Sequence, residues 1–565
     1  DGKRYANTFK EDQGSLGLCW NFAGQGATES SLMFHGAEGL DEAIEKCNND
    51  SNSKYCKYKE DYEKNQSYIN KESDDNLLFS KRYIDYIRAK PTGTTAYNRN
   101  KTNIYYTVEE RYNPFNTNGS LGEGGTMEQI LNFYSQGIAP LRNEGVFSNY
   151  TSNHDTFSLQ QIFTDRVGDY QIKDAFQIGY CSPSSSNYQE CKNNIKEAIS
   201  TYGALYVATS WTTSDKSCWF TNYDYKEEVD NYKDNYSLML NTTGICKTDS
   251  AHALQIVGWD DNYNYEYCQY TNSDGVRKSS NSKDYMSKET CDTNNGNWIS
   301  GKGAWLIKNS WGKTSAYKYI YMPYSASSTK WAVRKISVKD YNNVYSYKFS
   351  INTKTKHVEK INNTQYSGYV YEYTKANGSE YINSINFRTS YTKVDYQLYL
   401  SNDGENYELI KTATRDYPGL ETIDIDNYKI NGNKFYIKIL NSGSSIRIND
   451  INVFTRNECY LTDSCSDEEE IKLGVDKYLF DVDIEKINVI AETQNISSGT
   501  KLNYNIYNSN QENVSDKFSV ESNYVINNMN IGYLVPNKDV PGDTYKLVVD
   551  NGTTSNSVEF EIMDK

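Results

Sequence analysis

The second half of the chain is patterned with a period of two. Phe435, Ile437 and Ile439 alternate with the side chains between them, as in a strand with one buried face. Residues 396–400 and 407–410 flank an Asp-Gly turn, and this pattern predicts a β-hairpin. Several short strands separated by turns are typical of β-sandwiches, so we expect this part of the chain to be built from β-sheets.

The C-terminal part repeats this pattern after an acidic break. Residues 545–549 and 558–562 flank Asn551-Gly552, which predicts a final hairpin. The run Ser466-Asp467-Glu468-Glu469-Glu470 precedes this part and follows two cysteines. We interpret it as the acidic half of a disulfide-stapled hinge.

The N-terminal part has a different pattern, with helical spacing. Gly17 precedes Cys19, and Phe22, Ala27 and Met33 follow with small residues between them. This pattern predicts a loop that enters a helix at Cys19. The run 127–134 is also helical in pattern, and another helix with a following strand is expected within 196–208.

At 565 residues the chain exceeds one domain. We expect a first domain of mixed α and β structure and two all-β sandwiches, the last of them immunoglobulin-like. The predicted ranges are 1–338 for the first domain, 339–458 for the first sandwich, 459–470 for the hinge and 471–565 for the last sandwich.

Composition excludes two classes of function. The formal net charge is −15, and an acidic chain without a basic stripe is repelled by nucleic-acid phosphate. The sequence contains no apolar run of the length of a membrane span. No signal peptide precedes Cys19, so we expect a mature or truncated form of the protein.

The cysteines predict disulfides and an oxidising compartment. There are 11 of them, and removing Cys19 leaves ten that fall into neighbouring couples. Spacing does not prove connectivity, but five disulfides would imply a secreted or cell-surface protein. The couples are Cys47 with Cys56, Cys181 with Cys191, Cys218 with Cys246, Cys268 with Cys291, and Cys459 with Cys465.

Three motifs carry the chemistry. Gln13 lies six residues before Cys19-Trp20, His252 lies in Ala251-His252-Ala253, and Asn309 opens Asn309-Ser310-Trp311-Gly312. With only 4 histidines in the chain, a chance match at His252 is improbable. A Cys, a His and an orienting third residue are the parts of a nucleophilic site.

This order of motifs resembles the papain family of thiol proteases. The resemblance implies a two-lobed α+β fold in which Cys19 is the nucleophile and His252 holds the proton in a resting ion pair. Asn309 would orient the imidazole, and Gln13 would donate to the oxyanion together with the Cys19 backbone N–H. Trp311 would shield the bond between Asn309 and His252 from water.

The resemblance also implies a specificity pocket. Gly124 and Gly125 look like the glycine pair that binds substrate backbone in that family. Met127 and Ala251 would then line the main pocket, and because neither is charged we expect an apolar preference there. The alternative is that Met127 belongs to the helix core.

The chain departs from the family at two points. The family's signature is Cys-Gly-Ser/Ala-Cys-Trp, but in this chain Leu16 stands at the position of the first cysteine. Gly122 or Glu123 stands where the disulfide partner of that cysteine is expected. The numbers of residues between Cys19 and His252, and between Cys19 and Asn309, are also larger than in the family. Insertions near 37–120 and 260–303 would account for them.

A protease followed by a β-sandwich is similar to the clostridial surface-layer-processing cysteine proteases, whose second domain is called lectin-like. This resemblance implies an extracellular enzyme that acts on protein substrates. A lectin-like domain of that family can hold calcium, for which oxygens near Asp403 or Asp424 are candidates; the alternative is a solvated turn. Catalysis needs no cofactor, and whether a metal binds is unknown from the sequence.

Two functions remain open. The first is a secreted or cell-surface cysteine endopeptidase whose β domains contact a cell-wall or surface glycan or protein. The second is an adhesin or binding protein with an inactive papain-like fold. All of Gln13, Cys19, His252, Asn309 and Trp311 are intact, which favours the enzyme.

Overall fold

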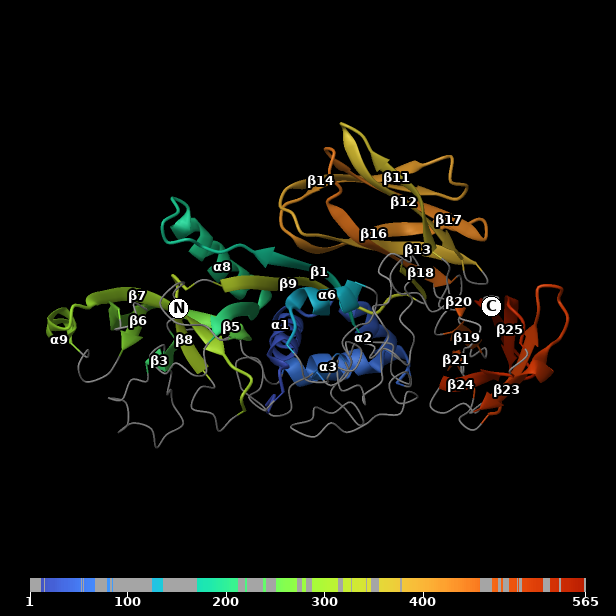
Figure 1. Cartoon of the computed structure of the whole chain (residues 1–565), viewed down its shortest axis with the longest axis horizontal. Coiled ribbons are helices and arrows are strands. Elements are labelled where there is room, and N and C mark those ends of the chain that lie inside the picture. Colours follow the sequence, from blue (N-terminus) through green and yellow to red (C-terminus); the bar gives the residue numbers. More distant parts are fainter. Residues whose placement is uncertain are drawn as a thin grey trace.

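A computed structural model gives the architecture of most of the chain (Figure 1). The residues it describes are 12–14, 16–51, 53, 55–66, 79–81, 84, 124–135, 170–211, 219–220, 237–239, 250–271, 277–280, 287–312, 319–326, 328–341, 343–346, 355–375, 379–457, 470–475, 479–480, 487–494, 496, 500–521, 529–537 and 540–562. Within these ranges the protein is mostly antiparallel β-sheet with few helices. The helices are α1 (Cys19–His35), α2 (Leu40–Asn49), α3 (Cys56–Gln66), α6 (Met127–Ser135), α8 (Tyr188–Tyr202) and α9 (Lys288–Thr293).

The largest sheet has 13 strands and runs through two of the predicted domains. Its main path is β10-β18-β13-β16-β1-β9-β2-β5-β7-β8-β4-β3, with β6 paired to β5. In chain order these strands are β1 (Tyr170–Ile178), β2 (Leu205–Trp211), β3 (Trp219–Phe220), β4 (Ser237–Met239), β5 (Ser250–Thr271), β6 (Arg277–Ser280), β7 (Asn297–Lys308), β8 (Tyr319–Pro323), β9 (Ser328–Val338), β10 (Asn343–Ser346), β13 (Glu380–Thr389), β16 (Gly419–Lys429) and β18 (Ile448–Asn457).

Helix α1 is central to the N-terminal part. All its residues from Trp20 to Met33 are buried, as expected of a helix enclosed on every side. It begins at Cys19, which confirms the predicted helix start, and ends where Gly36 adopts φ 71° and donates its N–H to the Leu32 carbonyl. The helix predicted over 127–134 is α6.

The sheet does not break where the first domain was predicted to end. Strand β9 ends at Val338, but β1 pairs on its other side with β16, placing Ala175 opposite Leu420. Gly419 makes this pairing feasible, since it adopts φ 140° and a Cβ there would lie 2.1 Å from the Ala175 carbonyl oxygen.

Strands β13, β16 and β18 of this sheet face a second, five-stranded sheet with the order β11-β12-β17-β14-β15. Buried side chains from both sheets form one core, which is the β-sandwich expected from the period-two pattern. The predicted hairpin is β14 paired with β15. The five strands are β11 (Thr355–Asn362), β12 (Tyr366–Thr374), β14 (Val394–Ser401), β15 (Glu408–Arg415) and β17 (Lys434–Ser442).

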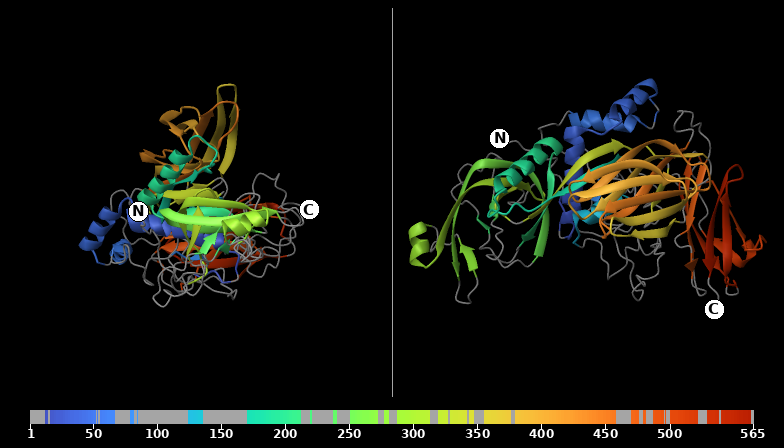
Figure 2. Two further views of the ribbon diagram at one scale, coloured as in Figure 1. Left: turned by 90° about the vertical axis from the view of Figure 1, so that its left-hand side faces the viewer. Right: turned by 90° about the horizontal axis from the view of Figure 1, so that it is seen from above.

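The C-terminal strands form two four-stranded sheets around a separate core. They lie at one end of the molecule in both Figure 1 and the view from above in Figure 2. The predicted final hairpin is β25 paired with β26, with Gly552 at φ 94° in its turn. The strands are β19 (Glu470–Val475), β20 (Leu479–Phe480), β21 (Ile487–Gln494), β22 (Asn503–Tyr507), β23 (Phe518–Glu521), β24 (Met529–Pro536), β25 (Asp543–Asp550) and β26 (Ser555–Ile562).

The second predicted insertion, 260–303, extends an existing hairpin. Strands β5 and β7 pair first near Ile256 and again beyond a register shift, up to Gln269. The helix α9 lies between them in sequence, and a disulfide joins Cys268 to Cys291. The insertion therefore lengthens the β5–β7 ribbon, which projects from the left of the molecule in Figure 1.

Candidate active site

Cys19 is the first residue of α1, where the backbone N–H groups of the first turn have no partner within the helix. It is half-buried and is the free cysteine among the described residues. Burial raises the pKa of its thiol, while hydrogen bonds from the backbone N–H groups of Ala253, Trp20 and Cys19 itself lower it, and the net direction is upward. The bond from Ala253 places the sulfur beside the residue that follows His252.

His252 and Asn309 are brought together by neighbouring strands. His252 lies on β5, and Asn309 directly follows β7, which pairs with β5. The His252 Nε2 atom lies 3.0 Å from the Asn309 Oδ1 atom. The same oxygen accepts the Ser310 backbone N–H at 2.8 Å, which identifies it as the amide oxygen.

This hydrogen bond defines the tautomer of His252. Because an amide oxygen only accepts, Nε2 must carry the hydrogen and Nδ1 keeps its lone pair. Burial lowers the pKa of His252 to about 4, and the bond to Asn309 opposes this shift. Together with the raised thiol pKa of Cys19, this direction favours an uncharged thiol and imidazole in the substrate-free protein. The resting ion pair implied by the family resemblance stays a prediction.

Trp311 lies against the imidazole of His252. Its ring stacks on His252 with centroids 5.4 Å apart and planes inclined by 22°. Asp12 forms an isolated β-bridge with Trp311, so the segment before Cys19 runs beside the Asn-Ser-Trp motif. The predicted shielding position of Trp311 agrees with this stacking.

Gln13 is buried and tied to Ser310. Its backbone N–H donates to the Ser310 carbonyl at 2.8 Å, and its Oε1 accepts the Ser310 hydroxyl at 2.5 Å. One N–H of its Nε2 donates to the Leu16 carbonyl at 2.7 Å. The predicted donation to an oxyanion therefore rests on the second N–H. Ser310 was not among the predicted site residues, although it lies inside the motif that contains Asn309.

Leu16, which stands where the family has a cysteine, is a core residue. It is 7% exposed and packs with Leu18 and Phe22. An apolar cluster thus fills the place of one half of the absent disulfide. Gly122 and Glu123 lie outside the described residues.

The residues predicted to bind substrate differ in exposure. Gly124 and Ala251 are exposed and Gly125 is half-buried. Met127 is completely buried in the core that contains Trp20 and Ile130. Its sulfur lies 3.1 Å from the position of a Cβ at Gly24, so Met127 presents no surface to a ligand in this conformation. The alternative of a helix-core residue describes its surroundings.

Three predicted disulfides are present. They join Cys47 to Cys56, Cys181 to Cys191, and Cys268 to Cys291. The other two couples, Cys218 with Cys246 and Cys459 with Cys465, lie outside the described residues. Each observed bridge closes a short loop, with sequence separations of 9, 10 and 23 residues.

The candidate calcium residues have protein partners. Asp403 accepts the backbone N–H groups of Glu405 and Asn406 and the Ser401 hydroxyl. Asp424 pairs with Lys173 and Lys335. Within the described ranges, no three His, Cys, Asp or Glu side chains converge as metal ligands would.

The described helices include none long and apolar enough to cross a membrane.

Comparison with known proteins finds similarity in structure only. No family model and no curated protein sequence matches the chain. A solved structure of the clostridial cysteine protease Cwp84 after propeptide cleavage is 15% identical, with 80% of this chain and 97% of that chain covered and a TM-score of 0.48. The cysteine protease and lectin-like domains of Cwp84, a surface-layer-associated protein of Clostridium difficile, are 15% identical over 80% of this chain and 86% of that chain, with a TM-score of 0.46. A family 89 glycoside hydrolase from Clostridium perfringens is 20% identical over 19% of this chain and 14% of that chain, with a TM-score of 0.15.

Proposed function

We propose that this protein is a cysteine endopeptidase of the papain-like type that acts outside the cell on protein substrates. The observation that carries the proposal is the hydrogen bond between His252 and Asn309, capped by Trp311 and adjacent to Cys19 through Ala253. A thiol, an imidazole and an orienting amide in this arrangement are typical of nucleophilic catalysis. The disulfides support an oxidising, extracellular location.

The reaction begins with proton transfer from the thiol to the imidazole. The Cys19 sulfur attacks the substrate carbonyl carbon while its proton passes to Nδ1 of His252, and the carbonyl oxygen gains the negative charge. The Cys19 N–H and the second amide N–H of Gln13 donate to that oxygen. His252 then gives the proton to the leaving amine, which leaves a thioester on Cys19.

Water completes the cycle. His252 takes a proton from the water that attacks the thioester carbonyl, and returns it to the departing Cys19 sulfur. Asn309 keeps the imidazole in one orientation through both halves of the reaction. The directions of both pKa shifts favour an uncharged Cys19 thiol and an uncharged His252 imidazole before substrate binds.

We further propose an apolar preference in the main specificity pocket, near Ala251 and Met127. Neither of the two residues predicted to line this pocket is charged, and Met127 would have to move to contact a substrate. Cleavage of a peptide library tests this preference: enrichment of apolar residues two positions before the scissile bond supports it, and enrichment of charged residues there contradicts it.

The β domains are proposed to contact a surface glycan or protein, with the last one immunoglobulin-like. Calcium binding by the first sandwich is tested by isothermal titration of the full chain with Ca²⁺. Heat of binding supports a site, and no heat at millimolar Ca²⁺ contradicts one.

Intact mass after treatment with an epoxysuccinyl thiol-protease inhibitor tests the catalytic proposal. We expect one inhibitor on the wild type and none on Cys19→Ala, because disulfide-bonded cysteines do not react. The control is the same treatment of urea-unfolded wild type, in which activation by His252 is lost. Failure of the folded wild type to react would contradict an activated thiol at Cys19.

A further inference from the structure

Strand β16 of the first sandwich belongs to the core of the protease part. Its Leu420 is completely buried and lies in the same cluster as Trp20, Tyr170 and Val333, which come from α1, β1 and β9. Leu420 lies opposite Ala175 in the pairing of β1 with β16. A side chain of the sandwich therefore fills the interior of the part that carries Cys19.

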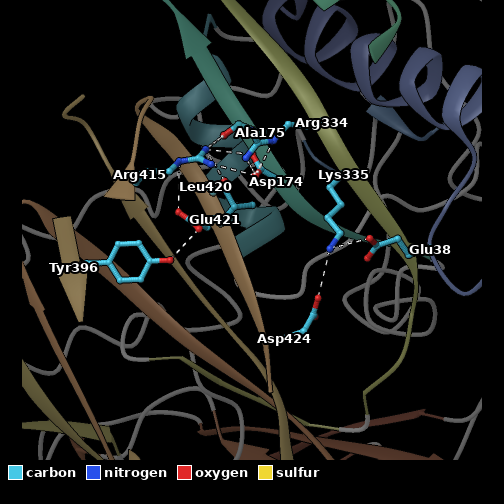
Figure 3. Close-up of polar contacts among 10 residues, drawn as sticks. All are labelled: Glu38, Asp174, Ala175, Arg334, Lys335, Tyr396, Arg415, Leu420, Glu421 and Asp424. Atoms are coloured by element: carbon cyan, nitrogen blue, oxygen red, sulfur yellow. Dashed lines mark hydrogen bonds and ion pairs between the residues drawn. The ribbon is translucent and has the colours of Figure 1, made fainter. Parts of the chain in front are cut away.

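A buried charge network crosses the same junction (Figure 3). The Asp174 carboxylate on β1 is 7% exposed and accepts from Nη1 and Nη2 of Arg415 at 3.1 and 3.2 Å. Arg334 on β9 donates to the same carboxylate, with its Nε at 3.0 Å. Such a bidentate contact has a fixed geometry, so it orients β15, which ends at Arg415, relative to β1.

Arg415 also binds backbone on both sides of the junction. Its Nη2 donates to the carbonyl of Ala175 at 3.1 Å and to that of Leu420 at 3.0 Å. The Arg415 side chain is only 4% exposed. A buried guanidinium without these acceptors would be strongly unfavourable, so separating β1 from β16 would leave several charged groups buried without partners or newly exposed.

A second group of charges lies further along the junction. Lys335 of β9 contacts Glu38 at 2.8 Å and Asp424 of β16 at 3.5 Å, and Lys173 of β1 contacts Asp424 at 2.6 Å and Glu38 at 3.5 Å. Two positive and two negative side chains thus contact one another, and Asp424 is the one that the sandwich contributes. Glu38 adds the loop between α1 and α2 to this contact.

Two further contacts at the junction are not ion pairs. The buried Asn386 of β13 donates its side-chain N–H to the Ser135 carbonyl at the end of α6, at 2.9 Å. The rings of Phe176 and Tyr417 pack with centroids 5.3 Å apart. The junction therefore combines strand pairing, apolar burial, a buried ion pair and a buried amide.

From these contacts we infer that the first β-sandwich is a structural part of the protease, unfolding with it as one unit, and is not a separately folded attachment module. Strand β16 completes the protease sheet, Leu420 completes its core, and Arg415 neutralises Asp174. The inference concerns folding and does not depend on catalysis by Cys19, so either proposal can fail without the other.

Tryptophan fluorescence distinguishes a sandwich that unfolds together with the protease part from one that folds separately. All 8 tryptophans lie within residues 1–338, so the signal reports unfolding of the protease part alone. Leu398 lies on β14, is completely buried and belongs to the sandwich core. We expect Leu398→Ala in the full chain to lower the urea midpoint seen by tryptophan fluorescence, and to shift the far-UV circular dichroism transition at that midpoint by the same amount, because a cooperative unit has one transition. The C-terminal sheets around their separate core contribute a circular dichroism transition of their own, which should not shift.

The matched control is Leu547→Ala. Leu547 is also a completely buried leucine in a β-sandwich, but in the core of the C-terminal sheets. We expect it to leave the tryptophan transition unchanged. If Leu398→Ala does not fold, Ile439→Val in the same core removes a single methyl group in its place.

Two results would overturn the inference. One is an unchanged tryptophan midpoint in Leu398→Ala, or in Ile439→Val, when circular dichroism shows that the sandwich has been destabilised. The other is an equal tryptophan shift in Leu547→Ala, because the effect would then not pass through β16.

Discussion

Glu29 and Lys81 form an ion pair of 2.6 Å inside the protein, and each side chain is 1% exposed. Glu29 lies on α1, and its Oε1 also accepts the Phe79 backbone N–H at 2.7 Å. Asn21 of the same helix donates to the Lys81 carbonyl. The short segment 79–81 of the first predicted insertion is thus bound along the helix that begins with Cys19.

Removing the charge of Lys81 should destabilise the fold strongly. Lys81→Met leaves the Glu29 carboxylate buried without its cation, which typically costs about 3–5 kcal/mol. The measurement is the free energy of unfolding in urea at pH 7. Lys288→Met is the control, because Lys288 pairs with Asp292 on the surface of α9 and its loss should change stability by less than about 1 kcal/mol. Similar effects of the two substitutions would contradict this account.

The two neighbouring glycines before α6 should respond differently to alanine. A Cβ at Gly125 would lie 2.5 Å from the Trp20 ring, whereas a Cβ at Gly124 meets nothing within 4 Å. We expect Gly125→Ala to cost about 1–3 kcal/mol through overpacking and Gly124→Ala to stay within about 0.5 kcal/mol. Urea unfolding of both variants checks this, and equal stabilities would show that Trp20 moves without cost.

Acid should destabilise the protein through His252. Its pKa is about 4 when folded, against an ordinary value of 6.5, so between these values the unfolded chain binds more protons. Stability therefore falls as pH drops from 6.5 towards 4, by about 3 kcal/mol for this group. The unfolding free energy of wild type should fall more steeply over this range than that of His252→Gln. Identical pH slopes would be inconsistent with a buried neutral imidazole.

Asn309→Ala should separate activity from stability. The Asn309 Nδ2 atom is buried and lacks a hydrogen-bond partner among the described residues, so its removal offsets part of the cost of leaving the His252 and Ser310 N–H groups without their acceptor. Loss of the bond to His252 should reduce kcat by roughly 10²-fold, with a smaller change in KM. Steady-state peptide hydrolysis checks this. Trp311→Phe, which retains an aromatic ring over His252, is the control and should keep more activity.

Local features of the fold were predictable because neighbouring residues encode them. Glycine followed by small and apolar residues identified the start of α1 at Cys19, and turn residues between alternating runs identified the β14–β15 and β25–β26 hairpins. The partnership of His252 with Asn309 followed from motif order, although the two residues are 57 positions apart.

Contacts between distant segments were not predictable. Asp174 and Arg415 are separated by 241 residues, and each looks in sequence like an ordinary surface charge. Their burial follows from the pairing of β1 with β16, which no local pattern encodes. In the same way, the family resemblance predicted that Met127 lines a pocket and left the helix core as the alternative, and only the packing with Trp20 and Ile130 distinguishes the two.

The pairing of β1 with β16 also fixes how far the sandwich lies from His252. Strands β16, β1, β9, β2 and β5 are neighbours in that order, and with adjacent strands about 4.8 Å apart the sandwich strand lies roughly 19 Å from the strand that carries His252. If the sandwich holds a substrate, the segment between the point of attachment and the scissile bond would have to span this separation. Selection among cleavage sites would then depend on the distance of a bond from the point of attachment as well as on its side chains.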